Sequence, residues 1–97
     1  MGFLIDPTMQ RIKDDMRLIL AEQSVINQNI ANANNPKYVA QSFDRILQKT
    51  VERQNVRVVM EEELKALGEN AAKYSADMRL LNFKMNVART IATQGRR

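Results

Sequence analysis

Side chains that could carry out catalysis are scarce in this chain of 97 residues. It contains no cysteine, which excludes disulfide bonds and thiol chemistry. It also contains no histidine, so the most common general base and transition-metal ligand is absent. Carboxylates and lysines remain, but no grouping of them suggests a catalytic site. We therefore expect that the protein is not an enzyme and that it holds neither a metal nor a cofactor.

The charge balance is mildly basic, with 15 Lys and Arg residues against 11 Asp and Glu residues and a net charge of +4. These charges are scattered, and neither a basic run nor an aromatic platform accompanies them. Because nucleic-acid binding normally needs such a concentrated surface, we expect no nucleic-acid partner. A basic hairpin that binds duplex DNA stays open as a minor alternative, which steeply salt-dependent binding would support.

Neither a membrane span nor a secretory signal peptide is expected. The longest apolar run in the first half of the chain covers residues 18–21, whereas a bilayer span needs roughly 20 apolar residues. The first six residues lack the basic start and the apolar run of a signal peptide. If the protein leaves the cytoplasm, we expect a route that does not read such a signal.

The elements that must position any functional residue begin with a long helix predicted over residues 7–33. Asp6 can cap its first turn, and Pro7 suits a position whose N–H has no partner. Asn34 to Pro36 mark its end, because Asn tolerates a helix terminus and the residue before proline leaves the helical region. Gln23 interrupts the apolar stripe, either as a solvated residue or as a register-setting one. The apolar residues of the stripe are Ile5, Met9, Ile12, Met16, Ile19, Ile26, Ile30 and Ala33.

The apolar spacing is most regular in the last part of the chain, where it predicts a second long helix. Glu61 to Glu63 lie in its first turn, where negative charge suits the helix dipole, and Gly95 marks its end. Gly68 interrupts the helix, either to admit a neighbouring helix or as a tolerated exposed residue. The apolar residues recur in steps of three and four. They are Leu64, Leu67, Ala71, Tyr74, Met78, Leu81, Met85, Ala88 and Ala92.

The middle of the chain is predicted as an extended link over residues 37–40, followed by a short amphipathic helix. Ser42 would cap this helix, whose apolar residues are Phe43, Ile46, Leu47 and Val51. Residues 55–59 read as a loop or short strand. The predicted fold is therefore all-α, with two long terminal helices paired as a coiled-coil-like hairpin. We divide it into an N-terminal helix and turn (1–36), a linker region (37–58) and a C-terminal helix (59–97).

Additional apolar rows lie beside the main stripes, and they suggest assembly. Two paired helices bury one stripe each, so large apolar residues outside these stripes would form an interaction surface. The alternative is a compact monomer in which the short middle helix covers them. The candidate subunit-packing residues are Ile12, Met16, Ile19, Ile26, Ile30, Leu64, Leu67, Tyr74, Met78, Leu81, Met85 and Ala88, with the second row Leu80, Val87 and Ile91.

Two segments resemble the flagellar rod, hook and hook-associated proteins. Residues 29–40 read NIANANNPKYVA, which is similar to the N-terminal motif of that family, and residues 61–74 read EEELKALGENAAKY, which resembles the C-terminal segment of its proximal-rod members. Lys37 and Val59 differ from the glycine and aspartate that are usual at these positions, and the region between the segments is short. The motif residues are Asn29, Ile30, Ala31, Asn32, Ala33, Asn34, Pro36 and Tyr38.

The resemblance implies a structural subunit of the flagellar basal-body rod. In this family the terminal helices pair and pack into a hollow, helical tube that transmits torque and conducts exported subunits. The implied partners are other copies, homologous rod subunits, and ring or export-gate proteins at the base of the rod. The implied location is the periplasm-spanning rod, reached through the flagellar type III export apparatus. A soluble helical adaptor or export chaperone of that apparatus is the alternative, and it would form a discrete complex with one client.

Overall fold

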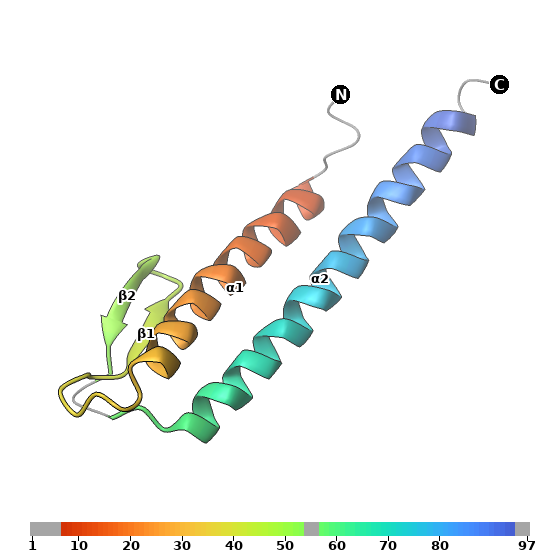
Figure 1. Ribbon diagram of the computed structural model, residues 1–97. Coiled ribbons are helices and arrows are strands. Elements are labelled where there is room, and N and C mark those ends of the chain that lie inside the picture. The colour runs from red at the N-terminus through yellow and green to blue at the C-terminus, as the bar shows by residue number, and fades with distance from the viewer. Residues whose placement is uncertain (1–6, 54–56, 95–97) are drawn as a thin grey trace.

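The computed structural model describes residues 7–53 and 57–94, which form two long antiparallel helices and a two-stranded hairpin (Figure 1). Helix α1 spans Pro7–Ala31, β1 spans Gln41–Asp44, β2 spans Lys49–Glu52, and α2 spans Met60–Gln94. The molecule measures 66 × 24 × 14 Å along its principal axes. The prediction of a mainly helical chain with two paired helices is confirmed. The cap Asp6, the stop Gly95 and residues 55 and 56 of the expected loop lie outside the described residues.

The predicted short middle helix is wrong, because these residues form an antiparallel β-hairpin. Gln41 pairs with Glu52 at the start of β1, and Asp44 pairs with Lys49 at its end. The carboxylate Oδ1 of Asp44 accepts hydrogen bonds from the N–H groups of Ile46 (2.9 Å) and Leu47 (3.1 Å). This local bonding satisfies the backbone in a turn and competes with a helix. Of the apolar side chains that suggested a helical face, Ile46 (93% exposed) and Leu47 remain in solvent, whereas Phe43 and Val51 are half-buried.

The end of α1 lies at Ala31, two residues earlier than predicted. The N–H of Asn32 bonds to the carbonyl oxygens of Gln28 and Asn29 at 3.1 and 3.3 Å, which tightens the last turn. Beyond it, the N–H of Lys37 donates to the side-chain oxygen of Asn35 at 3.0 Å. Gln48 is the one non-glycine residue with a positive φ within the described residues. Lys37 therefore does not adopt the left-handed conformation that glycine favours.

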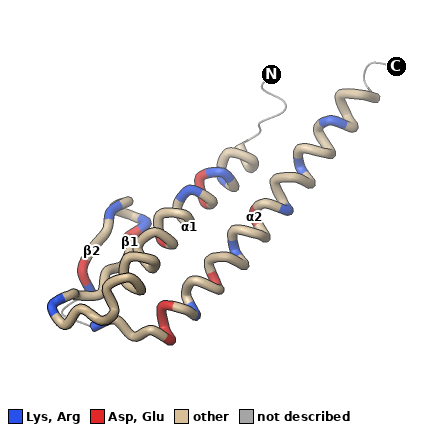
Figure 2. Tube along the Cα trace, in the orientation of Figure 1, with Lys and Arg blue, Asp and Glu red and all other residues tan. Residues whose placement is uncertain are grey.

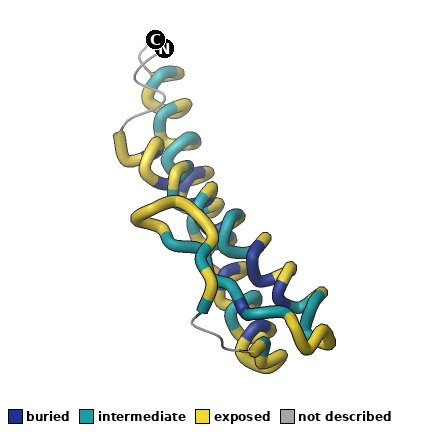
Figure 3. The backbone as a smooth tube through the Cα atoms, turned by 90° about the vertical axis from the view of Figure 1, so that its left-hand side faces the viewer, coloured by how far each residue is buried: buried dark blue, intermediate teal, exposed yellow. Residues whose placement is uncertain are grey.

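The apolar core joins the two helices, and buried residues recur at intervals along the chain (Figure 3). Met9, Ile12 and Met16 of α1 pack with Leu81 of α2, and the partly buried Tyr74 and Met85 pack against this group. Ile19, Val25 and Ile26 continue the buried row toward the hairpin. Each such side chain contributes about 1.5–3 kcal/mol when it is fully buried. The core therefore joins α1 and α2 along most of the length of α1.

Helix α2 starts directly after Val59, whose carbonyl oxygen accepts the N–H of Glu63 at 3.1 Å. Val59 has no side-chain acceptor for a cap, but the acidic first turn supplies the charge that suits the helix dipole (Figure 2). At Gly68, an added Cβ atom would meet nothing within 4 Å. The glycine therefore does not admit another helix of this chain.

Candidate functional site

A row of polar residues runs beside the apolar core, with one residue every seven positions on each helix. Because this spacing keeps residues on the same side of a helix and the helices are antiparallel, the two rows meet in reverse order. The two rows form three pairs of residues, one from each helix; we call the three pairs together the polar ladder and each pair a rung. The rungs are Asn29 with Glu63, Glu22 with Asn70, and Asp15 with Asp77.

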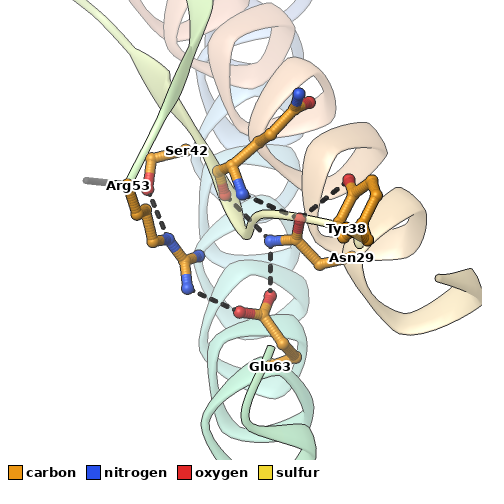
Figure 4. A network of polar contacts seen from close by, with 6 residues as sticks. Asn29, Tyr38, Ser42, Arg53 and Glu63 are labelled. Carbon is orange, nitrogen blue, oxygen red and sulfur yellow. Dashed lines mark hydrogen bonds and ion pairs between the residues drawn. The ribbon is translucent and has the colours of Figure 1, made fainter. Parts of the chain in front are cut away.

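The first rung is centred on Asn29, whose side chain is fully buried and uses all of its hydrogen-bonding capacity (Figure 4). Its Nδ2 donates to the carbonyl oxygen of Gln41 (2.8 Å) and to Oε2 of Glu63 (3.1 Å). Its Oδ1 accepts from the N–H of Gln41 (3.0 Å) and from the hydroxyl of Tyr38 (3.1 Å). One side chain thus joins the end of α1, the link that follows it, the start of β1 and the first turn of α2.

Glu63 completes this rung from α2 although its side chain is only 1% exposed. Its Oε1 accepts a 2.7 Å hydrogen bond from Nη1 of Arg53, which follows β2. The Nε of Arg53 donates in turn to the hydroxyl oxygen of Ser42 at 2.7 Å. A buried carboxylate needs both a counter-ion and hydrogen bonds to offset the loss of water. Arg53 and Asn29 supply them, so the hairpin helps to hold the first turn of α2.

The second rung consists of Glu22 and Asn70, which line the same cavity of about 200 Å³ between the helices and the hairpin. Asn70 is 5% exposed, and its Nδ2 has no hydrogen-bond partner within the described part of the chain. Glu22 pairs with Arg45, which lies in the turn of the hairpin. This rung is therefore less well satisfied than the first one.

The third rung brings two carboxyl groups together. The hydrogen bond with Asp15, burial and the charge of Asp15 raise the pKa of Asp77 to about 6, although Arg45 opposes this shift. The hydrogen bond from Asp77 and the guanidinium of Arg45, 2.9 Å from Asp15, hold the pKa of Asp15 below its ordinary value. Lys73 acts in the same direction on Asp15. Below a pH of about 6, the proton of this rung is therefore carried by Asp77 and not by Asp15.

This rung makes stability depend on pH. The pKa of Asp77 is raised in the folded chain. Its favourable contribution to the free energy of unfolding is therefore complete below pH 3.8 and is lost as the pH rises through about 6. We expect Asp77→Asn to raise the free energy of unfolding by about 1 kcal/mol at neutral pH, since Asp77 is partly exposed. The gain should vanish well below the pKa of about 6, where Asp77 itself is neutral.

Urea unfolding followed by circular dichroism, at about pH 7.5 and about pH 4.5, measures this effect. Asp14→Asn is the matched control, because Asp14 lies next to Asp15 but is exposed. We expect no pH-dependent gain from the control. An equal gain from Asp77→Asn at both pH values would show that carboxylate repulsion does not act at this rung.

The motif residues do not act as one group. Asn29, which belongs to the first rung, accepts a hydrogen bond from Tyr38, whereas Asn32 donates its amide to the carbonyl oxygen of Gln28 (2.8 Å). Ile30 and Ala33 are half-buried. Ala31, Asn34 and Pro36 are exposed. The fold therefore gives the motif one buried anchor, Asn29, and leaves most of its other residues near the surface.

The predicted packing stripes divide into three groups. Ile12, Met16, Ile19, Ile26 and Leu81 are buried in the chain, and Ile30, Leu67, Tyr74, Met85 and Ala88 are half-buried. Leu64 and Met78, which we placed on the stripe of α2 that faces α1, are exposed, as are Leu80, Val87 and Ile91. Leu64 and Met78 lie at one edge of the contact between the helices, and the polar residues of the ladder lie at the opposite edge.

The sequence interpretation missed the ladder. Glu63 was one of three first-turn glutamates, Arg53 was an unremarkable charge, and Gln23 was the only polar residue considered for setting the register. Gln23 is half-buried and lines an open groove on α1 with Leu20. The usable signal was the spacing of seven between polar residues on each helix.

The polar contacts of the ladder connect the hairpin to both helices.

The sequence matches no protein-family model and no curated protein. Within residues 7–53 and 57–94, no three Asp or Glu side chains gather as metal ligands would. No helix in these ranges is both long and apolar enough to cross a membrane.

Proposed function

We propose that this chain is a structural subunit of the flagellar basal-body rod, of the proximal-rod type represented by FlgB. The observation that carries the proposal is a row of large apolar side chains on α2 that the rest of the chain leaves in solvent. Phe83 is 64% exposed and Ile91 is 62% exposed; Val87 lies about one turn from each, and Leu80 lies about one turn before Phe83. Such a row is typical of a surface that packs against another protein.

The position of this row supports packing between subunits. It lies outside the seam that joins α2 to α1, so α2 can contact a neighbouring chain without releasing α1. The hairpin contacts α1 and leaves the row uncovered. The compact monomer in which a middle helix covers the spare rows is therefore not the arrangement of this chain.

The resemblance of residues 29–40 and 61–74 to the axial proteins of the flagellum supports the choice of the rod. Asn29 and Glu63, one from each of these segments, meet in the first rung of the ladder. In the proposed assembly the paired helices form part of the hollow shaft that transmits torque and lines the export channel. Its partners are other copies, homologous rod subunits and the ring or export-gate proteins at the rod base.

Purified basal bodies provide the test. We expect the chain to be recovered with the rod after detergent extraction and density-gradient purification, in a fixed ratio to the other rod subunits. A variant with Asn82→Asp, which changes an exposed polar residue, should be recovered equally. Recovery only as a soluble complex with one client would support the adaptor or chaperone and would contradict the rod subunit.

A further inference from the structure

We propose that the polar ladder selects the register in which α1 and α2 pair, and that the hairpin, which is fixed to α1, holds this register through the contact of Arg53 with α2. The apolar seam by itself selects the register only in part. Met, Ile and Leu recur along both helices, and the hydrophobic effect that joins them is not directional. A slip of seven residues would keep apolar residues at the seam, although Ala88 or Tyr74 would then take the place of Leu81. This role in the fold does not depend on the proposed function.

The rungs distinguish the observed register from its two nearest alternatives. Slipping α2 by seven residues in one direction would place Glu22 opposite Asp77, and the opposite slip would place it opposite Glu63. Each slip would put two carboxylates together at a central position of the interface, where solvent screens them least. In the observed register, Glu22 lies across the cavity from the neutral Asn70. The like-charged rung, Asp15 with Asp77, is the one farthest from the first rung, where the end of α1 meets the start of α2.

The hairpin strengthens this choice because one of its arginines contacts α2 and the other contacts α1. Arg53 pairs with Glu63 of the first rung at 2.7 Å. Arg45 pairs with Glu22 and, at 2.9 Å, with Asp15, both on α1, and so fixes the hairpin to that helix. A slip of α2 would carry Glu63 about 10 Å along the helix axis, out of reach of Arg53, at 1.5 Å per residue. The charged groups that face the ladder are thus contributed by α1, α2 and the hairpin turn.

The inference can be tested by moving the ladder along α2. The double substitution Asn70→Glu/Asp77→Asn places the Glu–Asn pair of residues 63 and 70 seven positions later. In the original register, Glu22 would then face a glutamate. In the slipped register, Asn29 faces Glu, Glu22 faces Asn, and Asp15 faces Lys84, so that each rung has a compatible partner.

Distances between two spin labels report the register. The chain contains no cysteine, so Ser24→Cys and Asn86→Cys, both at exposed positions, provide unique attachment sites. Electron-electron double resonance on the full chain should show the label distance shortened by about 10 Å in the double variant. Asp77→Asn alone is the control, and its label distance should be that of the unaltered chain.

An unchanged distance in a double variant with unchanged helical circular dichroism would overturn the proposal, because the apolar seam would then set the register. Loss of the helical signal would also overturn it, since a relocated ladder should keep the pair folded. The proposed rod function is read separately, from recovery in basal bodies. Failure there would leave the label distances as a valid test of the ladder.

Discussion

Replacing Asn29 by alanine is expected to lower the free energy of unfolding by about 3 kcal/mol, the largest loss for any single side chain of the ladder. The substitution removes four hydrogen bonds and leaves buried groups of Gln41 and Glu63 without their partner. Part of the loss arises because Glu63 is almost completely buried. The carboxylate would then depend on Arg53 alone. Urea unfolding followed by circular dichroism measures the loss.

Asn34→Ala is the matched control, because Asn34 belongs to the same motif but is exposed. Its effect should stay within about 0.5 kcal/mol. Asn29→Asp sharpens the test, since it keeps one acceptor oxygen but places a second carboxylate against Glu63. We expect this variant to be strongly destabilised at neutral pH and partly restored in acid. If Asn29→Ala and Asn34→Ala changed the free energy of unfolding by equal, small amounts, Asn29 would not be the residue that holds the ends of α1 and α2 and the start of β1 together.

The double substitution Phe83→Asp/Ile91→Asp is expected to abolish incorporation into the rod, with at least a tenfold loss of the chain from purified basal bodies. Both side chains are mostly exposed in the single chain. Their replacement should therefore change the free energy of unfolding of the isolated chain by no more than about 0.5 kcal/mol each. In a packed subunit contact, however, two buried aspartates without partners would be strongly unfavourable.

Asn82→Asp/Asn86→Asp is the control for this experiment, because it adds the same charge at exposed positions of the same helix. Immunoblotting of purified basal bodies, with expression levels matched, measures incorporation. Normal recovery of the Phe83→Asp/Ile91→Asp chain would mean that this row is not a subunit contact. Equal losses for both double variants would attribute the effect to charge and not to the apolar row.

The two long helices were predictable because their signals are local and repeated. The apolar steps of three and four, the asparagines and the single proline after α1, and the acidic first turn of α2 each act on neighbouring residues. The end of α1 was placed two residues too late, because Asn32 tightens the last turn before the asparagine-rich segment ends. This difference of two residues depends on the hydrogen bonds of one N–H group, which the spacing of apolar residues does not predict.

The hairpin and the ladder were not predictable in the same way. Phe43, Ile46, Leu47 and Val51 have a spacing that fits a helix, yet the fold places them in two strands and a turn. The decisive contacts come from outside the segment, because Asn29 bonds to both backbone groups of Gln41, and Arg45 bonds to α1. Long-range contacts of this kind override a weak local preference.

The partners of the rungs were also hidden by their distance in sequence. Asn29 and Glu63 are 34 residues apart, and neither is unusual in its local setting. Comparing the two helices for polar residues spaced by seven would have suggested the ladder. Such a comparison needs the pairing of the helices first, and the packing of Leu64 and Met78 was misjudged for the same reason. Periodicity identifies a stripe, but the contact with α1 decides which edge of it is buried.

Electron cryo-microscopy of isolated basal bodies tests the proposed role most directly. We predict density for α1 and α2 within the rod wall, with the side chains of Leu80, Phe83, Val87 and Ile91 against a neighbouring subunit. A rod whose density is fully explained by other chains would contradict this assignment. So would a copy of this chain in the rod whose apolar row faces only solvent.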